Sequence, residues 1–523
     1  MTSALSRTRE TRKTVIETAG GVVSAQNAVA ARIGADVLRA GGDAVDAAVA
    51  VSFAMGVLEP WMSGPAGGGA AVHWRADTGE ATAINFGMRS PVGLRVEDYP
   101  LSGEGVAGDL FPWQRVVEDR NLHGATAVAV PGTVAGVEAA HQRWGRMPWA
   151  ELVAPAIAAA RQGMAVDWYA SLVIGSVARE LARDADAAAL FLDEGTWPKA
   201  SGWTAVPNCR LDQSTMADSL DCISRDGAKA LHGGDLGAAL AADVAAKGGS
   251  LALGDLAGYR PWIGSAQPVA YRDALFHVVP GLTAGPTFAR ALAEMKGAPM
   301  DSLPESFAAC ADGLRAAYAE RLSTMGDTGE VPEVPGCTTH FAIVDRAGNI
   351  VSHTQTLLSL FGSKVVSPAT GFLLNNGIMW FDPEQGRPNS LAPSKACLMN
   401  VCPVIGRNDD AMFALGAAGG RKIVSSVVQL ASFLVDKGMS LEQAFHHPRI
   451  DVSGLDEVVV DARLPAEVGA RLAADARVVA AERTVLPFAF ACPSGVMRKD
   501  GRNSGCTEIE APWADTALEE EGQ

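Results

Sequence analysis

The stretch CTTHFAIVDRAGNIVSHTQT, residues 337–356, contains two runs with strand-like alternation and a turn between them at residues 347–349. This pattern predicts a β-hairpin. The segment before it, GDTGEVPEVPGC at residues 326–337, is rich in Pro, Gly and acidic residues, and it predicts a flexible, exposed connection. Two hydroxyl residues, Thr338 and Thr339, therefore stand at the start of a strand, directly after an exposed segment.

Cleavage of the bond between Cys337 and Thr338 would make this position catalytic. Thr338 would then carry a free α-amino group, which can take the proton of its own hydroxyl without a histidine. One residue would supply both the nucleophile and the base. Cys337 would become the C-terminus of the first chain, so it is given no catalytic role.

An acyl-transfer reaction also needs N–H donors for the negative charge that develops on the carbonyl oxygen. The run AMFALGAA at residues 411–418 predicts a strand, which leads through Gly419 and Gly420 into a helix predicted over residues 422–437. Backbone N–H groups at a glycine turn that opens a helix suit this task. Thr-Thr pairs and Gly-Gly turns are both common, so neither pattern is specific when taken alone.

Other parts of the chain predict a mixture of helices and strands. Residues 28–39 and 44–58 have helical spacing, and Asp43 is a suitable N-cap for the second helix. The glycine-rich run SGPAGGGAAVHW then returns to a strand pattern. Residues 130–330 are predicted to be mainly helical.

Composition excludes several classes of function. The 523 residues carry a net charge of −16, which argues against nucleic-acid binding, because that binding depends on clustered Lys and Arg. The apolar runs are too short to cross a membrane, and the N-terminus has no signal-peptide pattern, so a cytoplasmic protein is expected. The eight cysteines lack zinc spacing, which favours free thiols and neither a metal nor another cofactor.

The chain resembles the gamma-glutamyltranspeptidase family across most of its length. The resemblance is carried, in order, by AGGDAVDAAVAVSFAMGVLEPWMSGPAGGG, VPGTVAGVEAAHQRWG, PWAELVAPAIAAARQG, GGSLALGDLAGYRP and TTHFAIVDRAGNIVSHTQTLLSLFGSKVVSPATGFLLNN. Thr338 matches the family's nucleophile. Thr356 matches the threonine whose hydroxyl bonds to that nucleophile, and Gly419 and Gly420 match the oxyanion glycines.

This resemblance implies an α+β fold, a four-layer αββα sandwich of the N-terminal-nucleophile hydrolase type. It also implies a proenzyme that is cut into a large chain, residues 1–337, and a small chain, residues 338–523. The two chains would stay together in one core. Whether they form a further homodimer is left open.

The residues that hold the glutamyl group in this family are changed here. Gly87 occupies the position of the family's arginine, with Arg89 displaced by two residues. Gly377 and Trp380 stand where the family has Gln and Asp for the substrate's amino group. Further polar contacts are replaced by Leu358 and by the pair Met399 and Asn400. The stretch WFDPEQGRPNSLAPSK is more similar to amidase-type relatives, such as oxamate amidohydrolases and cephalosporin-type acylases.

The altered pocket makes several side chains candidates for binding a new substrate. The assigned set is Asn400, Arg421, Trp380, Asn376 and Arg89. Arg387 and Lys395 are weaker candidates, and each residue has an alternative role as a surface or supporting side chain. His340 and His353, on the hairpin, are interpreted as core residues.

These observations favour a self-processing threonine amidohydrolase or acyltransferase that acts on a small-molecule amide. One alternative is a genuine gamma-glutamyl hydrolase or transferase. Another is a catalytically silent scaffold with the same fold. A metal enzyme using His446 and His447 is the weakest alternative, because adjacent histidines point in different directions on a regular element.

Overall fold

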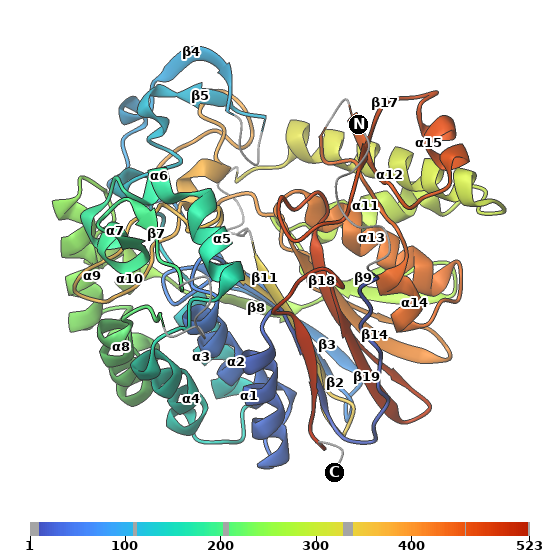
Figure 1. The fold of residues 1–523 in the computed structure, drawn as a ribbon, viewed down its shortest axis with the longest axis horizontal. Coiled ribbons are helices and arrows are strands. Elements are labelled where there is room, and N and C mark those ends of the chain that lie inside the picture. Colours follow the sequence, from blue (N-terminus) through green and yellow to red (C-terminus); the bar gives the residue numbers. More distant parts are fainter. Residues whose placement is uncertain (1–9, 108–111, 202–208, 328–337, 455–456, 521–523) are drawn as a thin grey trace.

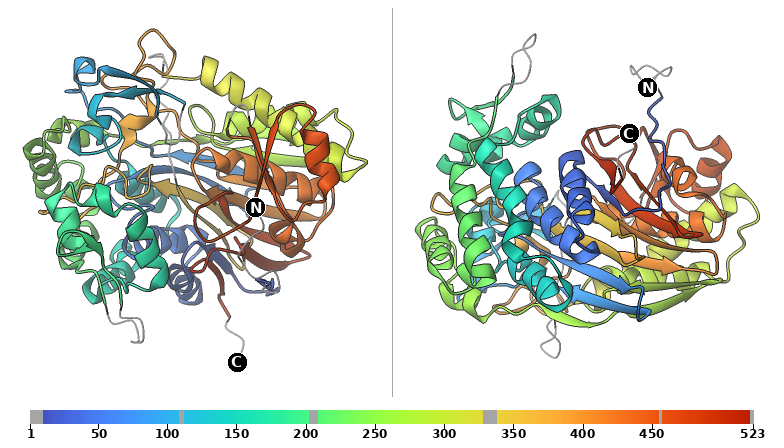
Figure 2. Two further views of the ribbon diagram at one scale, coloured as in Figure 1. Left: turned by 45° about the horizontal axis from the view of Figure 1, so that its top comes forward. Right: turned by 90° about the horizontal axis from the view of Figure 1, so that it is seen from below.

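Two stacked β-sheets with helices on both outer sides form the body of the protein (Figure 1). The computed structural model describes residues 10–107, 112–201, 209–327, 338–454 and 457–520. In the right-hand view of Figure 2, blue and green helices lie on one side of the strands, and orange and yellow-green helices lie on the other. The α+β fold with four layers in the order αββα is therefore confirmed.

The first sheet has seven strands in the order β20-β1-β11-β12-β2-β3-β8, and every neighbouring pair is antiparallel. Its strands are β1 (Val22–Ala25), β2 (Gly68–Arg75), β3 (Glu80–Asn85), β8 (Trp262–Ser265), β11 (Thr339–Val344), β12 (Ile350–Thr356) and β20 (Asp515–Leu518). The predicted hairpin, β11 and β12, lies near the middle of this sheet.

The second sheet has six antiparallel strands in the order β19-β18-β14-β13-β10-β9. They are β9 (Gln267–Tyr271), β10 (Ala274–Val278), β13 (Val404–Arg407), β14 (Ala411–Ala418), β18 (Cys492–Lys499) and β19 (Arg502–Thr507). Smaller sheets are formed by β15 (Ile450–Asp451), β16 (Glu457–Asp461) and β17 (Arg477–Ala481), by β4 (Leu101–Val106) and β5 (Gln114–Val116), and by β6 (Leu192–Asp193) and β7 (Trp197–Pro198).

Helices cover the outer face of each sheet. Against the first sheet lie α1 (Ala28–Arg39), α2 (Ala44–Leu58) and α3 (Thr133–Trp144). Outside them, α4 (Trp149–Gln162) packs against α2, and α8 (Ser214–Asp226) packs against α4. The second sheet is covered by α11 (Gly285–Met295), α13 (Lys422–Val435) and α14 (Leu441–His446). Helix α12 (Leu303–Thr324) packs against α11 and α13, and α15 (Ala466–Leu472) packs against α12 and β17. The remaining helices are α5 (Trp168–Ser176), α6 (Ala178–Leu181), α7 (Ala185–Phe191), α9 (Asp235–Ala246) and α10 (Leu253–Gly258).

Helix α2 is the central helix of its layer. The Asp43 carboxylate accepts hydrogen bonds from the N–H groups of Val45 and Asp46, as predicted for an N-cap. All side chains from Ala44 to Val57 are buried, because α2 is enclosed by the sheet, α1 and α4. A helix that is apolar on all sides belongs in a core of this kind. The predicted bounds of α1 and α2 match the structure.

Two further predictions can be compared with the structure. The helix predicted over residues 422–437 ends two residues earlier, at Val435. The region 130–330 is mainly helical, but it also supplies β8, β9 and β10, which the sequence pattern did not reveal. Among the described residues, none of the helices could cross a membrane, and the seven described cysteines are free thiols.

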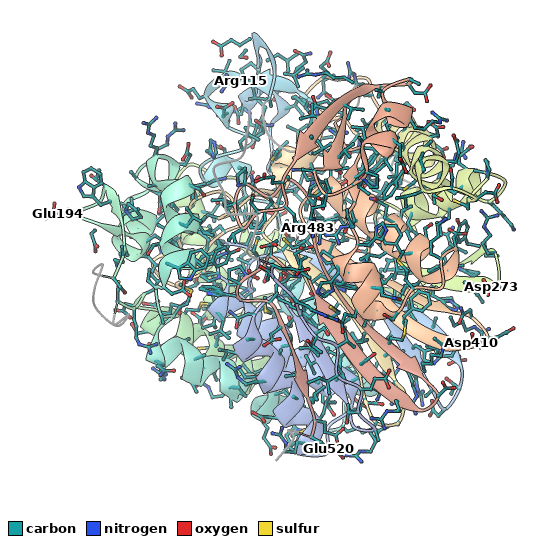
Figure 3. The ribbon with its side chains drawn as sticks, turned by 45° about the vertical axis from the view of Figure 1, so that its right-hand side comes forward. Arg115, Glu194, Asp273, Asp410, Arg483 and Glu520 are labelled. Carbon is teal, nitrogen blue, oxygen red and sulfur yellow. The ribbon has the colours of Figure 1, made fainter. Side chains whose placement is uncertain are left out.

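A buried ionic cluster holds the loop that precedes β18. Arg449 donates to the Glu508 carboxylate and, at 3.3 Å, to the Ala491 carbonyl oxygen. The Arg483 guanidinium lies 3.4 Å from the same Glu508 carboxylate. In Figure 3, Arg483 lies near the centre of the molecule, whereas the other labelled charged residues lie toward its rim. Burial lowers the pKa of Arg483 to about 10, so the group remains charged at neutral pH.

Removal of Glu508 would leave two buried guanidinium groups without their shared carboxylate. We predict that Glu508→Ala lowers the free energy of unfolding by about 3–5 kcal/mol, measured by urea denaturation. The control is Glu118→Ala, which breaks an exposed ion pair with Arg120 and should cost less than about 1 kcal/mol. Equal losses in the two variants would contradict a structural role for the buried cluster.

Candidate active site

Thr338 lies immediately before β11, at one end of the β11–β12 pair. Thr339 is opposite Gln355 in this antiparallel pair, so the next position places Thr338 opposite Thr356. Thr338 is 1 % exposed, and its hydroxyl has no hydrogen-bond partner among the described residues. The Thr356 hydroxyl accepts a 2.7 Å hydrogen bond from the Leu358 N–H. The hydrogen bond between the two hydroxyls that the family resemblance implies is not present in this structure.

Residues on one strand alternate between the two faces of the first sheet. Thr339 faces the helices, where its hydroxyl bonds to the carboxyl of Glu59, the residue that follows α2. Thr338 therefore points to the opposite face, toward the second sheet. His340 points the same way, because a Cβ placed on Gly416 of β14 would lie 2.3 Å from its ring.

The direction of β14 shows which end of the second sheet meets Thr338. Ser352, opposite Ala342 of β11, donates a 3.0 Å hydrogen bond to the Leu415 carbonyl oxygen. His340, two residues closer to Thr338, lies against Gly416. Moving along β11 toward Thr338 therefore means moving along β14 toward its C-terminal end. The Gly419-Gly420 turn lies at that end of the sandwich.

The two glycines connect β14 to α13 in a conformation that side chains disfavour. Gly419 has φ 137° and Gly420 has φ 60°. A Cβ on Gly419 would also lie 2.9 Å from Ala491, the residue held by the buried ionic cluster. Within the described part of the chain, no hydrogen bond uses the N–H of either glycine. The turn can therefore present two backbone donors to a ligand, as an oxyanion hole requires.

The glycine-rich run before β2 lets that strand lie very close to β12. A Cβ on Gly67 would lie 2.0 Å from the Thr356 carbonyl oxygen, and one on Gly69 would lie 2.2 Å from that of Thr354. Only glycine fits at these positions. The conformation of the chain around Thr356 therefore depends on this run.

Two of the predicted substrate residues have buried polar atoms without partners. Asn400 is 1 % exposed, and both its Oδ1 and its Nδ2 lack hydrogen bonds among the described residues. Trp380 is fully buried, and its Nε1–H is also unpaired there. Because an unsatisfied buried polar group costs about 1–3 kcal/mol, such groups suggest contact with a ligand or water.

Arg421 follows the glycine turn directly. Its guanidinium lies over the ring of Tyr318, 5.7 Å from the centroid, and its buried Nη2 has no partner in the described residues. Burial lowers the pKa of Arg421, while Tyr318 and Asp451 oppose that shift. The Tyr318 hydroxyl donates to the Arg421 carbonyl oxygen, so α12 also holds the backbone of the turn.

The other predicted substrate residues have protein partners. Asn376 donates to Leu122 O and Ser359 Oγ, at 3.1 and 2.9 Å, and accepts from the Ser359 N–H. Arg89 donates to Ser394 O at 2.8 Å. These contacts tie loops together, so both residues have supporting roles in the structure.

The two weaker candidates, Arg387 and Lys395, also have partners within the protein. Arg387 is ion-paired with Asp382 and Glu384, and Lys395 donates to two carbonyl oxygens of its own loop. Cys337, the predicted residue before the cut, lies outside the described residues.

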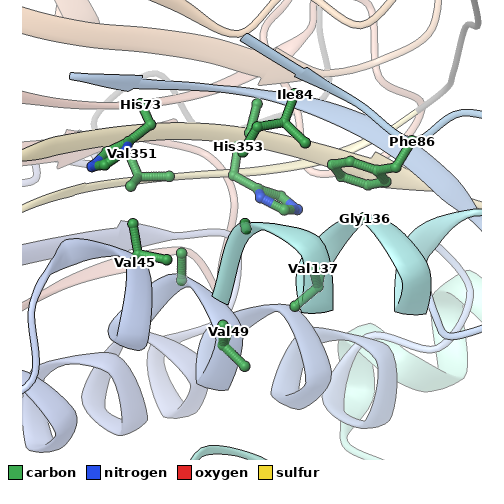
Figure 4. A pocket seen from close by; sticks show the side chains of 12 residues that line it. Val45, Val49, His73, Ile84, Phe86, Gly136, Val137, Val351 and His353 are labelled. Atoms are coloured by element: carbon green, nitrogen blue, oxygen red, sulfur yellow. The ribbon is translucent and has the colours of Figure 1, made fainter. Parts of the chain in front are cut away.

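The hairpin histidines are core residues, as interpreted from the sequence. His340 shares a 2.8 Å hydrogen bond with the Thr354 hydroxyl, and His353 stacks on Phe341 with ring centroids 4.5 Å apart. Figure 4 shows His353 beside Phe86 in a small apolar cavity between the first sheet and its helices, on the side away from Thr338. Burial lowers the pKa of both histidines to about 3, so they are neutral at pH 7.

His446 and His447 bind other parts of the chain. His446 contacts Glu442 O and the N–H of Lys13, and His447 contacts Pro448 O. Among the described residues, no group of three His, Cys, Asp or Glu side chains is arranged to hold a metal ion. Nothing in this part of the chain supports the metal-enzyme alternative.

Glu59 is a residue of the site that the sequence analysis did not single out. It caps the C-terminal end of α2 and accepts a 3.1 Å hydrogen bond from the Thr339 hydroxyl. Its side chain is buried, and this burial raises the pKa of the carboxyl from 4.5 to about 8. In the sequence, Glu59 is marked only as an acidic residue between an apolar helix and Pro60. Its contact with Thr339 becomes visible only in the folded structure.

From the raised pKa of Glu59 we predict how the stability of the protein depends on pH. In the folded protein the carboxyl keeps its proton up to about pH 8, whereas in the unfolded chain it loses the proton near pH 4.5. The wild type should therefore lose stability relative to Glu59→Gln as pH rises between these values, by on the order of a few kcal/mol. Urea denaturation at about pH 5 and about pH 8 measures this. A stability difference independent of pH would contradict the assignment.

Comparison with known proteins gives the class to which this fold and site belong. The family model described as Gamma-glutamyltranspeptidase matches residues 30–336 and 330–509. The chain belongs to the gamma-glutamyltranspeptidase family, and it is an enzyme of the N-terminal-nucleophile hydrolase type.

Individual relatives include acylases and glutathione hydrolases. The chain is 34 % identical over 489 residues to the Acylase ACY 1 proenzyme of Pseudomonas sp. (strain SE83), covering 84 % of this chain and 85 % of the relative. It is 29 % identical over 509 residues to the Glutathione hydrolase proenzyme of Bacillus subtilis (strain 168), covering 86 % and 84 %. The crystal structure of cephalosporin acylase from Bacillus halodurans shares the fold, with a TM-score of 0.85, 22 % identity and full coverage of both chains.

Proposed function

We propose that the protein is a self-processing amidohydrolase or acyltransferase with Thr338 as its N-terminal nucleophile. One observation carries this proposal. Thr338 has a buried, unbonded hydroxyl at the end of β11 that faces the second sheet, and the Gly419-Gly420 turn lies at the same end of the sandwich. The proenzyme names of the relatives support processing into two chains.

The reaction follows from the roles of these groups. After cleavage between Cys337 and Thr338, the new α-amino group takes the Thr338 hydroxyl proton as Oγ attacks the carbonyl carbon of the amide. The N–H groups of Gly419 and Gly420 stabilise the oxyanion. The proton then passes to the leaving amine, which departs as the carbon–nitrogen bond breaks. Water or an amine releases the acyl group from the resulting ester.

Thr356 supports this chemistry from the neighbouring strand. Its hydroxyl already accepts the Leu358 N–H, which fixes its orientation and leaves its own proton to donate. It lies opposite Thr338 in the register of the hairpin. A hydrogen bond from Thr356 to Thr338 would therefore hold the nucleophile in place during attack.

The unpaired polar atoms favour an acyl group rich in hydrogen-bond acceptors. Trp380 Nε1, Asn400 Nδ2 and Arg421 Nη2 are three donors, whereas Asn400 Oδ1 is the single acceptor of the set. Donors of this kind suit a carboxylate or oxo group and do not suit an ammonium group. We infer an acylase-like or oxamate-amidohydrolase-like specificity, in which the acyl group has no α-amino group. The 34 % identity to an acylase supports this inference.

Replacement of the nucleophile tests the proposed mechanism. Thr338→Ala should remain a single chain and lose amidase activity by at least about a thousandfold, because nucleophile and processing group are the same hydroxyl. Thr338→Ser, which keeps the hydroxyl, is the matched control and should be cut. Intact mass spectrometry and N-terminal sequencing detect the fragment beginning Thr338-Thr339-His340.

Thr356→Ala should slow both processing and turnover by only about tenfold, as expected for one lost hydrogen bond. A Thr338→Ala protein that is still cut and still active would mean that the nucleophile is elsewhere. An uncut and inactive wild-type protein would instead favour the silent-scaffold alternative.

A pair of matched substrates tests the inferred specificity. Glutaryl-p-nitroanilide and γ-glutamyl-p-nitroanilide differ only in the α-amino group. Because a buried ammonium group without a partner costs several kcal/mol, kcat/KM for the glutaryl compound should be higher by at least about a hundredfold. Release of p-nitroaniline measures both rates. A preference for the γ-glutamyl compound would support the glutathione-hydrolase alternative.

A further inference from the structure

The buried carboxyl of Glu59 is bonded to Thr339, the residue that directly follows the proposed nucleophile. Thr338 and Thr339 are consecutive residues whose side chains point to opposite faces of the first sheet. The Thr339 hydroxyl donates to Glu59 Oε2 at 3.1 Å, and this is the one hydrogen bond of the carboxyl within the described residues. Glu59 is therefore connected to the residue that follows Thr338, through a single hydroxyl.

The other polar groups near Thr339 already satisfy one another. Gln355, the residue opposite Thr339 in the hairpin, accepts from Ser52 Oγ and donates to Ser52 O and Ser63 Oγ. His353 also contacts Gln355 Oε1, at 3.1 Å. These groups form a closed neutral network. They do not supply a counter-charge for Glu59.

Among the described residues, the titratable groups that interact electrostatically with Glu59 are neutral at pH 7. They are the Tyr169 phenol of α5 and the Cys492 thiol of β18, and burial raises the pKa of each far above neutrality. Burial lowers the pKa of His353, on the neighbouring strand, to about 3, so this side chain carries no charge either. Among these groups, Glu59 alone changes its charge near neutral pH.

We propose that Glu59 is a positioning residue that acts through Thr339 to set the pH at which the α-amino group of Thr338 becomes a base. The inference rests on the proposed function, since this amino group exists only after cleavage before Thr338. No catalytic contact with substrate is assigned to Glu59. Its influence is electrostatic, and the hydrogen bond to Thr339 fixes the distance over which it acts.

The direction in which Glu59 shifts the pKa of the Thr338 α-amino group follows from the charges of the two groups. An α-amino group ordinarily has a pKa of about 7.7–8.0, in the range where Glu59 also titrates. Two such groups in close proximity lose their protons as a coupled pair. An ionised Glu59 stabilises the ammonium form of Thr338, which raises the pKa of the amine and delays formation of the free base.

The experiment measures the amine directly and needs no knowledge of the natural substrate. Purified, matured protein is acetylated with limiting acetic anhydride between about pH 5 and about pH 10. Mass spectrometry of the peptide that begins at Thr338 gives the rate of α-amino acetylation. Glu59→Gln keeps the size and the hydrogen bond of the side chain but cannot ionise. It should lower the midpoint of this profile by about one pH unit.

Two further variants separate an electrostatic effect from a structural one. Asp46→Asn removes a carboxylate that is buried at the opposite end of the same helix, and should leave the midpoint unchanged. Thr339→Val removes the hydrogen bond that stabilises the charged form of Glu59, so Glu59 stays protonated to higher pH. This variant should shift the midpoint downward, as Glu59→Gln does, and it provides the same test if Glu59→Gln does not fold.

The outcomes distinguish failure of this inference from failure of the proposed function. If the wild type is cut before Thr338 but both variants titrate as the wild type does, Glu59 has no electrostatic role and this inference alone is wrong. If the wild type yields no chain that begins at Thr338, the proposed function is wrong as well. A similar downward shift in Asp46→Asn would show a general structural effect and would also overturn the inference.

Discussion

The register between β11 and β12 determines where the proposed nucleophile and its immediate neighbours lie. It places Thr338 opposite Thr356 and directs Thr339 toward Glu59. Because side chains alternate along a strand, a slip of one residue would turn Thr338 toward the helices and bury its hydroxyl against α2. Sheet pairing on both sides of the hairpin prevents such a slip, through β1 on one edge and β2 on the other.

The distribution of satisfied and unsatisfied polar groups separates structural residues from those available to a ligand. Asn375 illustrates the first kind, since its amide bonds to Ala66 O, Ala129 O and two backbone N–H groups. Asn400 is equally buried but has no hydrogen bond to any described residue. A fold that satisfies one buried asparagine fully and leaves another unpaired favours a ligand-binding role for the second.

The sequence predicted the features that depend on local pattern. Alternation predicted the hairpin, and the Asp43 cap with an apolar run predicted α2 to its exact bounds. Features that depend on contacts between distant segments could not be predicted in this way. Glu59 meets Thr339 across 280 positions of sequence, and whether Asn376 or Asn400 is free depends on loops that no local pattern describes. The roles assigned to Thr338, Thr356 and the two glycines stay predictions.

Helix α12 links the two parts of the site that would handle substrate. Tyr318 bonds to the carbonyl oxygen of Arg421 beside the glycine turn, and Arg321, one turn further along, bonds to the carbonyl oxygen of Met399 beside Asn400. Both contacts are made to the backbone, so they persist when the side chains at positions 399, 400 and 421 change. In this chain, the backbone on both sides of the candidate site is therefore held independently of the side chains that are proposed to contact substrate. This explains how the departures at Met399 and Asn400 are compatible with an intact glycine turn.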